Sequence, residues 1–153
     1  MPFQTEAWTA YAAGKSGLIH APTGLGKTLA AWLGPVMHHA EEGGLRVLWI
    51  TPLRALAADT VRSLQEALDG AEAAQKVEAR TGDTSSSVRA RQKARPPFAL
   101  VTTPESLSLL LTDEVQKANR CGLRAVIVDE WHERMGSKRG VQTELCLARL
   151  RAL

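Results

Sequence analysis

Apolar residues are arranged along the chain in a repeating pattern. Short runs of apolar residues, which are typical of strands covered on both faces of a sheet, occur at residues 18–21, 46–51, 98–102 and 124–128, and residues 76–80 predict a weaker strand. The segments between them predict helices at residues 4–13, 27–42, 53–69, 85–94, from 104 onward and at 140–150. We therefore expect an α/β fold in three layers, with a mostly parallel sheet between two layers of helices.

Glycine and proline residues mark the ends of these expected helices. Gly14, Gly70 and Pro96 follow the first, third and fourth helices. Pro35 lies inside the segment 27–42, and because proline has no N–H to donate, we expect it to kink that helix or to end its first half.

Function in open parallel sheets lies at the carboxyl ends of the strands, so the residues after each expected strand are the candidate site. The first strand leads into Ala-Pro-Thr-Gly-Leu-Gly-Lys-Thr, which ends at Thr28 and matches the phosphate-loop pattern except for its first alanine. Gly24 and Gly26 allow backbone N–H groups to turn toward a phosphate. We expect Lys27 to reach the β- and γ-phosphates and Thr28 to hold Mg²⁺; the alternative is an ordinary glycine turn.

Two acidic residues follow the last expected strand. Asp129 and Glu130 come directly after Val126, Ile127 and Val128. We expect Asp129 to bind Mg²⁺ and Glu130 to act as the general base for an attacking water molecule. Together with a phosphate loop, these acids predict a site that hydrolyses a nucleoside triphosphate, whereas alone they would be a surface turn.

Two other strand ends carry threonine and proline. Thr51, Pro52 and Arg54 follow the second strand, and Thr102 and Thr103 follow the fourth. Hydroxyl groups and helix N-termini can bind a nucleic-acid backbone, but the same residues also serve as helix caps. The residues alone leave both interpretations open.

Composition and charge exclude several classes of protein. The chain has 153 residues, of which 44% are hydrophobic and 23% charged, and only two cysteines, so it is neither disordered nor a disulfide scaffold. No apolar run approaches the roughly 20 residues that cross a bilayer, and no signal peptide is visible, so we expect a cytoplasmic protein without a membrane partner. The net charge is +3, and residues 80–95 are rich in arginine, which predicts either a phosphate-binding patch or a solvated helix face.

The chain resembles the first RecA-like domain of superfamily 2 helicases in six motifs that occur in the same order. They are Gln4, APTGLGKT at 21–28, TPLRAL at 51–56, TGDT at 81–84, TTPES at 102–106 and DEWH at 129–132. The stretch DEWHE, followed by GSKRGVQTELCLARLR at 136–151, is similar to the large-helicase-related (Lhr) group, which includes the ligase-associated DEXH-box helicases of bacteria.

This resemblance implies a phosphate-loop NTPase fold and a role for each matching residue. ATP and Mg²⁺ are the implied ligands, and Gln4 would read the edge of adenine. The triphosphate would be held by Thr23, Gly24, Leu25, Gly26, Lys27 and Thr28. The nucleic-acid backbone would be touched by Thr51, Pro52, Arg54, Gly82, Thr102 and Thr103. His132 would couple the nucleotide state to movement. The implied activity is ATP-driven 3′-to-5′ translocation on single-stranded DNA or a 3′-tailed duplex, in DNA repair, with a DNA ligase or repair nuclease as a partner.

The resemblance also predicts what the chain lacks. No Ser-Ala-Thr motif follows DEWH, and the second RecA-like domain is absent, so we expect residues 1–153 to form a partial first domain, incomplete at the C-terminus. The strand that carries Ser-Ala-Thr lies between the phosphate-loop strand and the DExH strand, and its loss would leave unpaired backbone groups in a core. We therefore expect the chain to be poorly stable, and inactive or very weakly active, on its own.

Two alternatives from other functional classes remain at this point. A small phosphate-loop kinase would suit the length of the chain, with Arg89, Arg91, Lys93 and Arg95 as its lid. A nucleic-acid-binding module without catalytic activity is the other. ATP turnover that single-stranded DNA stimulates would favour the helicase over both.

Overall fold

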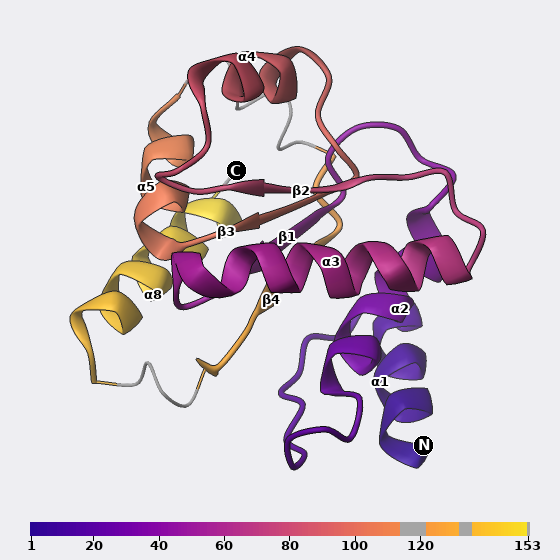
Figure 1. Ribbon diagram of the computed structural model, residues 1–153. Helices are drawn as coiled ribbons and strands as arrows, with labels where there is room; N and C mark the ends of the chain where they lie inside the picture. The colour runs from indigo at the N-terminus through magenta and orange to yellow at the C-terminus, as the bar shows by residue number, and fades with distance from the viewer. Residues whose placement is uncertain (114–121, 132–135, 153) are drawn as a thin grey trace.

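The computed structural model describes residues 1–113, 122–131 and 136–152, and the description of the fold refers to these. Its centre is a four-stranded sheet in which every strand pairs in parallel with its neighbours (Figure 1). The strands, in the spatial order β2-β3-β1-β4, are β2 (Val77–Arg80), β3 (Ala99–Thr102), β1 (Val47–Ile50) and β4 (Ala125–Val128). The predicted parallel α/β sheet is confirmed.

Six described helices surround this sheet. They are α1 (Pro2–Ala12), α2 (Lys27–His39), α3 (Arg54–Gly70), α4 (Ser86–Ala94), α5 (Pro104–Thr112) and α8 (Lys138–Arg151). Their bounds lie close to the predicted ones. Local capping explains several starts, because the Ser85, Thr103 and Ser137 hydroxyl groups accept hydrogen bonds from backbone N–H groups in the first turns of α4, α5 and α8.

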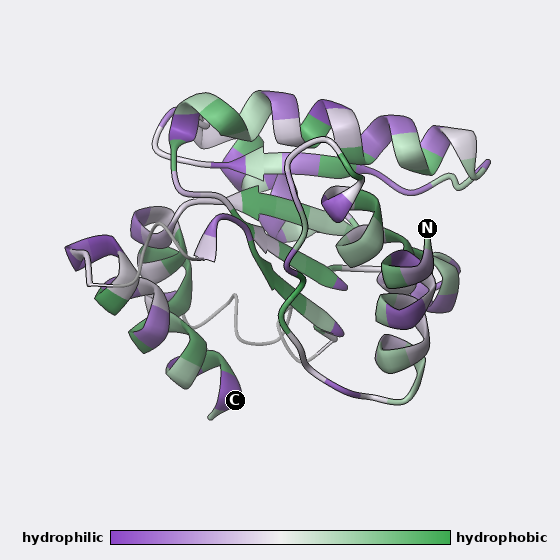
Figure 2. Cartoon of the chain, turned by 90° about the horizontal axis from the view of Figure 1, so that it is seen from below, coloured by the Kyte–Doolittle hydropathy of each residue, from purple (hydrophilic) through white to green (hydrophobic). Residues whose placement is uncertain are grey.

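The helices form a layer on each face of the sheet, with a separate apolar core in each (Figures 1 and 2). Alternate residues of each strand point to opposite faces. Val47 and Trp49 of β1 join the core under α2 and α3, whereas Leu48 and Ile50 join the core under α5 and α8. Near-continuous apolar strands are therefore required, because both faces of the sheet are covered.

Trp32 joins α2 to α3 at the centre of the first core. Its side chain is fully buried, and its Nε1 donates a hydrogen bond to the Leu64 carbonyl of α3 at 3.1 Å. The indole also makes edge-on ring contacts with Trp49 and Phe98, a geometry that adds to the apolar burial.

One expectation about local structure is wrong, and one of the two alternatives for Pro35 is excluded. Residues 18–21 form no strand, and the Leu18 side chain is 76% exposed. A strand needs a neighbour to pair with its backbone, and the described sheet ends at β4 without reaching this segment. Pro35 does not end α2, which continues to His39, because the packing of α2 against α1 and α3 outweighs the local loss of one hydrogen bond.

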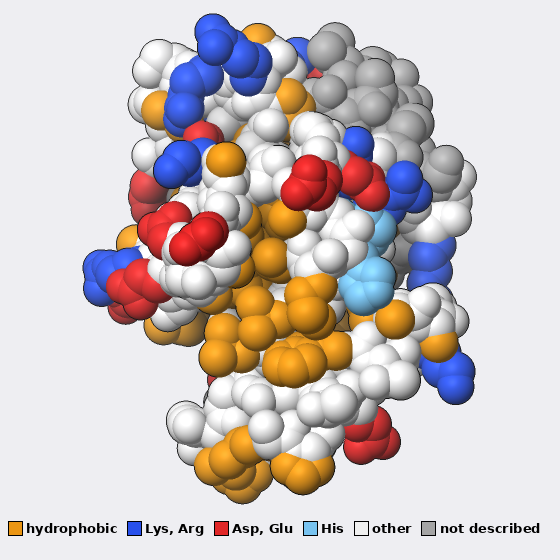
Figure 3. Space-filling view, turned by 90° about the vertical axis from the view of Figure 1, so that its right-hand side faces the viewer, with side chains coloured by type: hydrophobic (Ala, Val, Ile, Leu, Met, Phe, Trp, Pro, Cys, Tyr) orange, Lys and Arg blue, Asp and Glu red, His pale blue; other side chains and the backbone are white. Residues whose placement is uncertain are grey.

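The outer surface of α1 and α2 is partly apolar. Seen from the side on which these helices lie, apolar side chains gather at the centre of the face, with histidine side chains beside them (Figure 3). No helix in the described residues is both long and apolar enough to cross a membrane.

Candidate nucleotide-binding and nucleic-acid site

The carboxyl ends of all four strands lie level at one edge of the sheet. Ile50 pairs with both Thr102 and Val128, and Arg80 pairs with Thr102. Each predicted motif that follows a described strand therefore begins at this edge. Backbone hydrogen bonds continue the alignment, because the Thr51 N–H donates to the Thr102 carbonyl and the Asp129 N–H donates to the Ile50 carbonyl, both at 2.9 Å.

The phosphate loop has the backbone that its glycines predict. Gly24 and Gly26 adopt φ angles of +85° and +83°, in the left-handed region that favours glycine. Gly26 is also the N-cap of α2, so Lys27 and Thr28 occupy the first turn of that helix. The positive end of the helix dipole and the lysine charge therefore lie together, an arrangement that favours an anion.

Gln4 contacts the phosphate loop directly. Its Nε2 donates a hydrogen bond to the Gly26 carbonyl at 3.1 Å, and its Oε1 accepts one from the N-terminal amino group at 3.2 Å. The helix α1 packs against α2 (Figure 1), so Gln4 joins the start of the chain to the turn that begins α2. The tertiary structure alone reveals this contact, because 22 residues separate the two partners.

A cavity of about 850 Å³ brings the phosphate loop and the acidic motif together. Thr23 and Lys27 line it from the loop, Pro52 from the segment after β1, and Glu130 from the segment after β4. Lys27 and Glu130, which are more than 100 residues apart in the sequence, thus share one cavity. Gln4, Gly24, Leu25, Gly26, Thr28 and Asp129 are not among its lining residues.

The acidic pair has an unusual backbone. Glu130 adopts a φ of +53°, which is rare for a residue other than glycine, and its N–H donates to the Asp129 Oδ1 at 3.0 Å. Backbone strain of this kind persists only where surrounding structure maintains it, and it is concentrated at functional sites.

The donor atoms at this edge suit Mg²⁺. The Thr28 hydroxyl and the Asp129 carboxylate are hard oxygen ligands, which this ion prefers, and it is usually held by few protein groups together with substrate phosphates. The described residues contain no cluster of three or more histidine, cysteine or acidic side chains, so a metal cage built from protein side chains alone is absent from this part of the chain.

Three predicted nucleic-acid contacts are buried. Thr51, Thr102 and Thr103 are 0%, 0% and 2% exposed. The Thr102 hydroxyl donates to the Arg80 carbonyl at 2.7 Å, and the Thr103 hydroxyl caps α5 by accepting from the Ser106 N–H. A nucleic acid at this edge would therefore meet the main chain and neighbouring surface groups before these hydroxyls. Direct contact between the threonine hydroxyls and a nucleic acid stays a prediction.

Two other predicted contacts lie beside each other on the surface. The guanidinium of Arg54 lies over Gly82, where a Cβ atom would come within 3.0 Å of its Nη1. Arg54 also pairs with Asp83 at 3.0 Å, and both side chains are more than half exposed. Exposed pairs of this kind are weak, so Arg54 can exchange Asp83 for another anion.

Several basic side chains of the segment 80–95 contact neighbouring groups. Arg91 forms a two-pronged ion pair with Glu78, Lys93 pairs with Asp113, and Arg89 donates to three backbone carbonyls. Burial, and secondarily the charge of Arg89, lowers the pKa of Arg80. Arg91 and Lys93 are thus paired with carboxylates, and the phosphate-binding patch stays a prediction.

Some residues lie outside the predicted set, and one predicted residue lies outside the described structure. Ser137 and Arg139, at the start of α8, line the same cavity as Lys27 and Glu130. Their signal in the sequence is the GSKRG stretch, which contributed only to the resemblance. His132, predicted to couple nucleotide state to movement, is not among the described residues.

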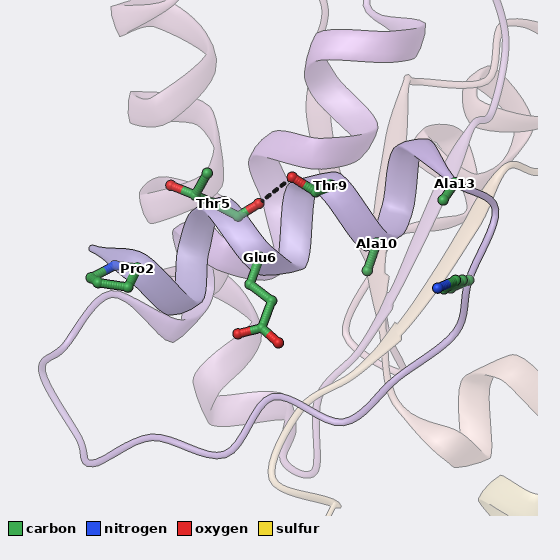
Figure 4. Close-up of a pocket in the computed structure, with 7 residues that line it drawn as sticks. Pro2, Thr5, Glu6, Thr9, Ala10 and Ala13 are labelled. Atoms are coloured by element: carbon green, nitrogen blue, oxygen red, sulfur yellow. Dashed lines mark hydrogen bonds between the residues drawn. The ribbon is translucent and has the colours of Figure 1, made fainter.

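A second hollow runs along α1 and is open to solvent. Its lining comes from one side of this helix and from Lys15 beyond it, as Figure 4 shows, and the Thr9 hydroxyl donates to the Thr5 carbonyl within the helix. Glu6 and Lys15 are its charged groups. The hollow contains none of the predicted site residues.

Comparisons with known proteins agree with this site. The DEAD/DEAH box helicase family matches residues 1–153. The chain is 40% identical over 171 residues to the Lhr helicase/uracil glycosylase of Escherichia coli strain K12, covering 98% of the chain and 11% of that relative. It is 38% identical over 156 residues to the ATP-dependent helicase Lhr-Core of Methanothermobacter thermautotrophicus, covering 92% of the chain and 18% of that relative. The chain thus spans less than a fifth of the length of either relative.

Solved structures give the same result for the fold. The Mycobacterium smegmatis helicase Lhr, bound to single-stranded DNA and AMP-PNP, matches with a TM-score of 0.90 and 42% identity over 98% of this chain and 21% of that one. The DUF1998 helicase MrfA, bound to DNA and AMPPNP, matches with a TM-score of 0.78 and 27% identity over 86% of this chain and 19% of that one. The family match over the whole chain, together with the cavity shared by Lys27 and Glu130, shows that the chain belongs to the DEAD/DEAH box helicase family and is similar to its Lhr helicases.

Proposed function

We propose that this chain is the ATP-binding part of the first RecA-like domain of an ATP-dependent DNA helicase. The observation that carries the proposal is the cavity shared by Lys27 of the phosphate loop and Glu130 of the acidic motif. Family membership supports ATP use, and the solved Lhr relative is bound to an ATP analogue and single-stranded DNA. The family match and the Lhr relatives favour the helicase over the kinase alternative, whose expected lid was Arg89, Arg91, Lys93 and Arg95.

The proposal gives each residue of the expected nucleotide site a role. The loop from Thr23 to Gly26 would surround the phosphates with backbone N–H groups, and Lys27 would pair with the β- and γ-phosphates. Thr28 and Asp129 would hold Mg²⁺, which neutralises charge on the phosphates when bound. Glu130 would take the proton from the attacking water molecule. Gln4 would read the adenine edge from its position beside the loop.

The nucleic-acid contacts belong to the same proposal. Arg54 and Gly82 support it best, because they form one exposed surface with a weakly paired guanidinium. Thr51, Pro52, Thr102 and Thr103 would contribute main-chain contacts from adjacent strand ends, and His132 would couple the nucleotide state to movement. A sequence-independent motor needs such backbone contacts, because they carry no base information.

The finer biological role is also proposed. We infer 3′-to-5′ translocation on single-stranded DNA or a 3′-tailed duplex, in repair, in the cytoplasm, with a ligase or repair nuclease as partner. A second RecA-like domain would supply arginines to the γ-phosphate, and such groups accelerate related phosphoryl transfers by roughly 10³- to 10⁵-fold. Residues 1–153 without it would be inactive or very weakly active.

The test is ATP turnover by the native gene product that carries this sequence, with and without single-stranded DNA or RNA. We expect DNA to stimulate turnover, and Lys27→Ala to reduce it by about a hundredfold or more, because a phosphate-binding charge is lost. Lys15→Ala is the matched control, since Lys15 lies outside the nucleotide cavity. Phosphate transfer to a small acceptor, or DNA binding without turnover, would contradict the proposal.

Strand polarity needs a separate measurement. Duplexes with only a 3′ tail or only a 5′ tail are offered to the same protein with ATP. We expect unwinding of the 3′-tailed duplex alone, and preferential unwinding of the 5′-tailed duplex would refute the proposed direction.

A further inference from the structure

Arg139 connects the nucleotide cavity to a second strand end. It lines the cavity that holds Lys27 and Glu130, yet its Nε also forms an ion pair with the Glu105 Oε1 at 3.1 Å. Glu105 lies in the first turn of α5, two residues after the predicted nucleic-acid contact Thr103. One side chain therefore lies against both the expected phosphate site and the expected nucleic-acid edge.

The contact between Arg139 and Glu105 is easily exchanged. Their side chains are 53% and 49% exposed, and exposed pairs of this kind contribute little because water and salt screen them. A triphosphate carries more negative charge than one carboxylate, and arginine binds phosphate through two parallel hydrogen bonds. A nucleotide in the cavity would thus compete with Glu105 for the Arg139 guanidinium.

The helices behind the two residues are packed together. The Arg149 guanidinium of α8 donates to the Leu111 carbonyl of α5 at 3.2 Å, and the buried Cys146 thiol lies 4.0 Å from the Pro104 carbonyl. Because these other contacts join α5 to α8, the Arg139–Glu105 ion pair, which lies near the cavity, can break while the two helices stay packed. Glu105, the residue that would be released, lies in the first turn of α5, where Thr103 is the cap.

We propose that Arg139 is a positioning residue that moves from Glu105 to the nucleotide phosphates, and so couples nucleotide binding to the affinity of the TTPES edge for nucleic acid. The inference rests on the proposed function. The inference goes beyond the proposed function, because it assigns a coupling role to residues of the GSKRG stretch and of the start of α5. Arg139 itself is expected to contact the phosphates only when nucleotide is bound.

The test measures a coupling factor in the native gene product, which is the ratio of dissociation constants for single-stranded DNA without and with AMP-PNP. We expect a factor of at least about fivefold in the unaltered protein, the low end of ordinary coupling between sites. Arg139→Ala should bring the factor to within about twofold of one and weaken AMP-PNP binding by about tenfold, since a charge-assisted hydrogen bond is lost. Glu105→Gln should also abolish the coupling but tighten AMP-PNP binding, because Arg139 is released.

Controls separate this inference from a structural role and from the proposed function. Lys138→Ala removes the same charge from the neighbouring residue, which does not line the cavity, and should leave both constants unchanged. Normal coupling in Arg139→Ala, with or without a lower melting temperature, would overturn the inference. Coupling below about twofold in the unaltered protein would also overturn it. If the unaltered protein binds no ATP at all, the proposed function fails first and the inference falls with it.

Discussion

At the residue scale, the phosphate loop depends on backbone conformations that only a few side chains allow. Gly24 and Gly26 share nearly the same left-handed φ angle, but their surroundings differ. A Cβ atom on Gly24 would meet nothing within 4 Å, whereas one on Gly26 would lie 2.5 Å from the Gln4 Nε2. The two glycines therefore separate the effect of conformation from the effect of a tertiary contact.

We predict that Gly26→Ala destabilises the loop more than Gly24→Ala. Both substitutions cost about 1–2 kcal/mol from the left-handed conformation, but only Gly26→Ala also displaces Gln4. Equilibrium AMP-PNP binding and denaturant unfolding measure the difference. Gln4→Ala in the Gly26→Ala background should recover part of the loss, and equal effects of the two alanine variants would contradict the importance of this contact.

Threonine hydroxyls at the sheet edge provide a second comparison. The Thr51 hydroxyl is buried with no hydrogen-bond partner among the described residues, whereas the Thr102 hydroxyl donates to the Arg80 carbonyl. We predict that Thr51→Val is neutral or stabilising, because it removes an unsatisfied polar group, and that Thr102→Val costs about 1 kcal/mol. Urea unfolding measures both values.

The same variants test the predicted nucleic-acid contact of Thr51. If its hydroxyl binds the backbone, Thr51→Val should weaken DNA binding although it does not lower stability. Unchanged DNA affinity would assign Thr51 to the core alone.

At the element scale, Glu42 ties the end of α2 to two strands. Its carboxylate contacts the His39 Nδ1 at 2.6 Å and the Arg46 Nε at 2.8 Å, and it pairs with Arg124 at 3.4 Å. The hydrogen bond with His39, followed by the influence of Arg124, lowers the pKa of Glu42. Tyr11 of α1 packs edge-on against His39, and burial raises the pKa of its phenol.

This arrangement predicts acid sensitivity. A carboxyl group whose pKa is lower in the folded state stabilises that state above its ordinary pKa of 4.5, and the contribution is lost as the pH falls through the lower folded value. Glu42→Gln should therefore reduce stability near neutral pH and flatten its decline below pH 4.5. Melting temperatures across this range measure the effect.

Glu41→Gln is the matched control for this prediction. Glu41 is exposed and forms no ion pair among the residues described in the structure. An equal flattening of the pH profile in both variants would assign the effect to overall charge rather than to the contacts of Glu42.

At the scale of the whole molecule, one side of the sheet lacks a described neighbour. β4 is apolar throughout, yet all four of its residues are only partly buried, and no described strand pairs with its outer edge. Residues 18–21, which lead into the phosphate loop, form no strand, and Ile19 lines the nucleotide cavity. We propose that a further strand belongs between them in the complete domain.

We predict that about 40 further residues of native sequence, enough for a strand, a helix and their loops, raise the melting temperature clearly. The added strand would pair the backbone of both neighbours and bury their apolar side chains. An unrelated extension of equal length is the control. Cooperative unfolding of residues 1–153 at high temperature, unchanged by the native extension, would refute the proposal of a partial domain.

The residue pattern by itself determined the order of the elements, the parallel sheet and the identity of the motifs. These are local properties, because apolar runs, glycine positions and helix caps act over a few residues, and parallel strands bring their carboxyl ends to one edge. Only the tertiary structure decided the contact of Gln4 with Gly26, the cavity shared by Lys27 and Glu130, and the position of Arg139 between that cavity and Glu105. It also decided that residues 18–21 form no strand. Such features depend on which distant segments become neighbours, and neither periodicity nor spacing in one sequence contains that information.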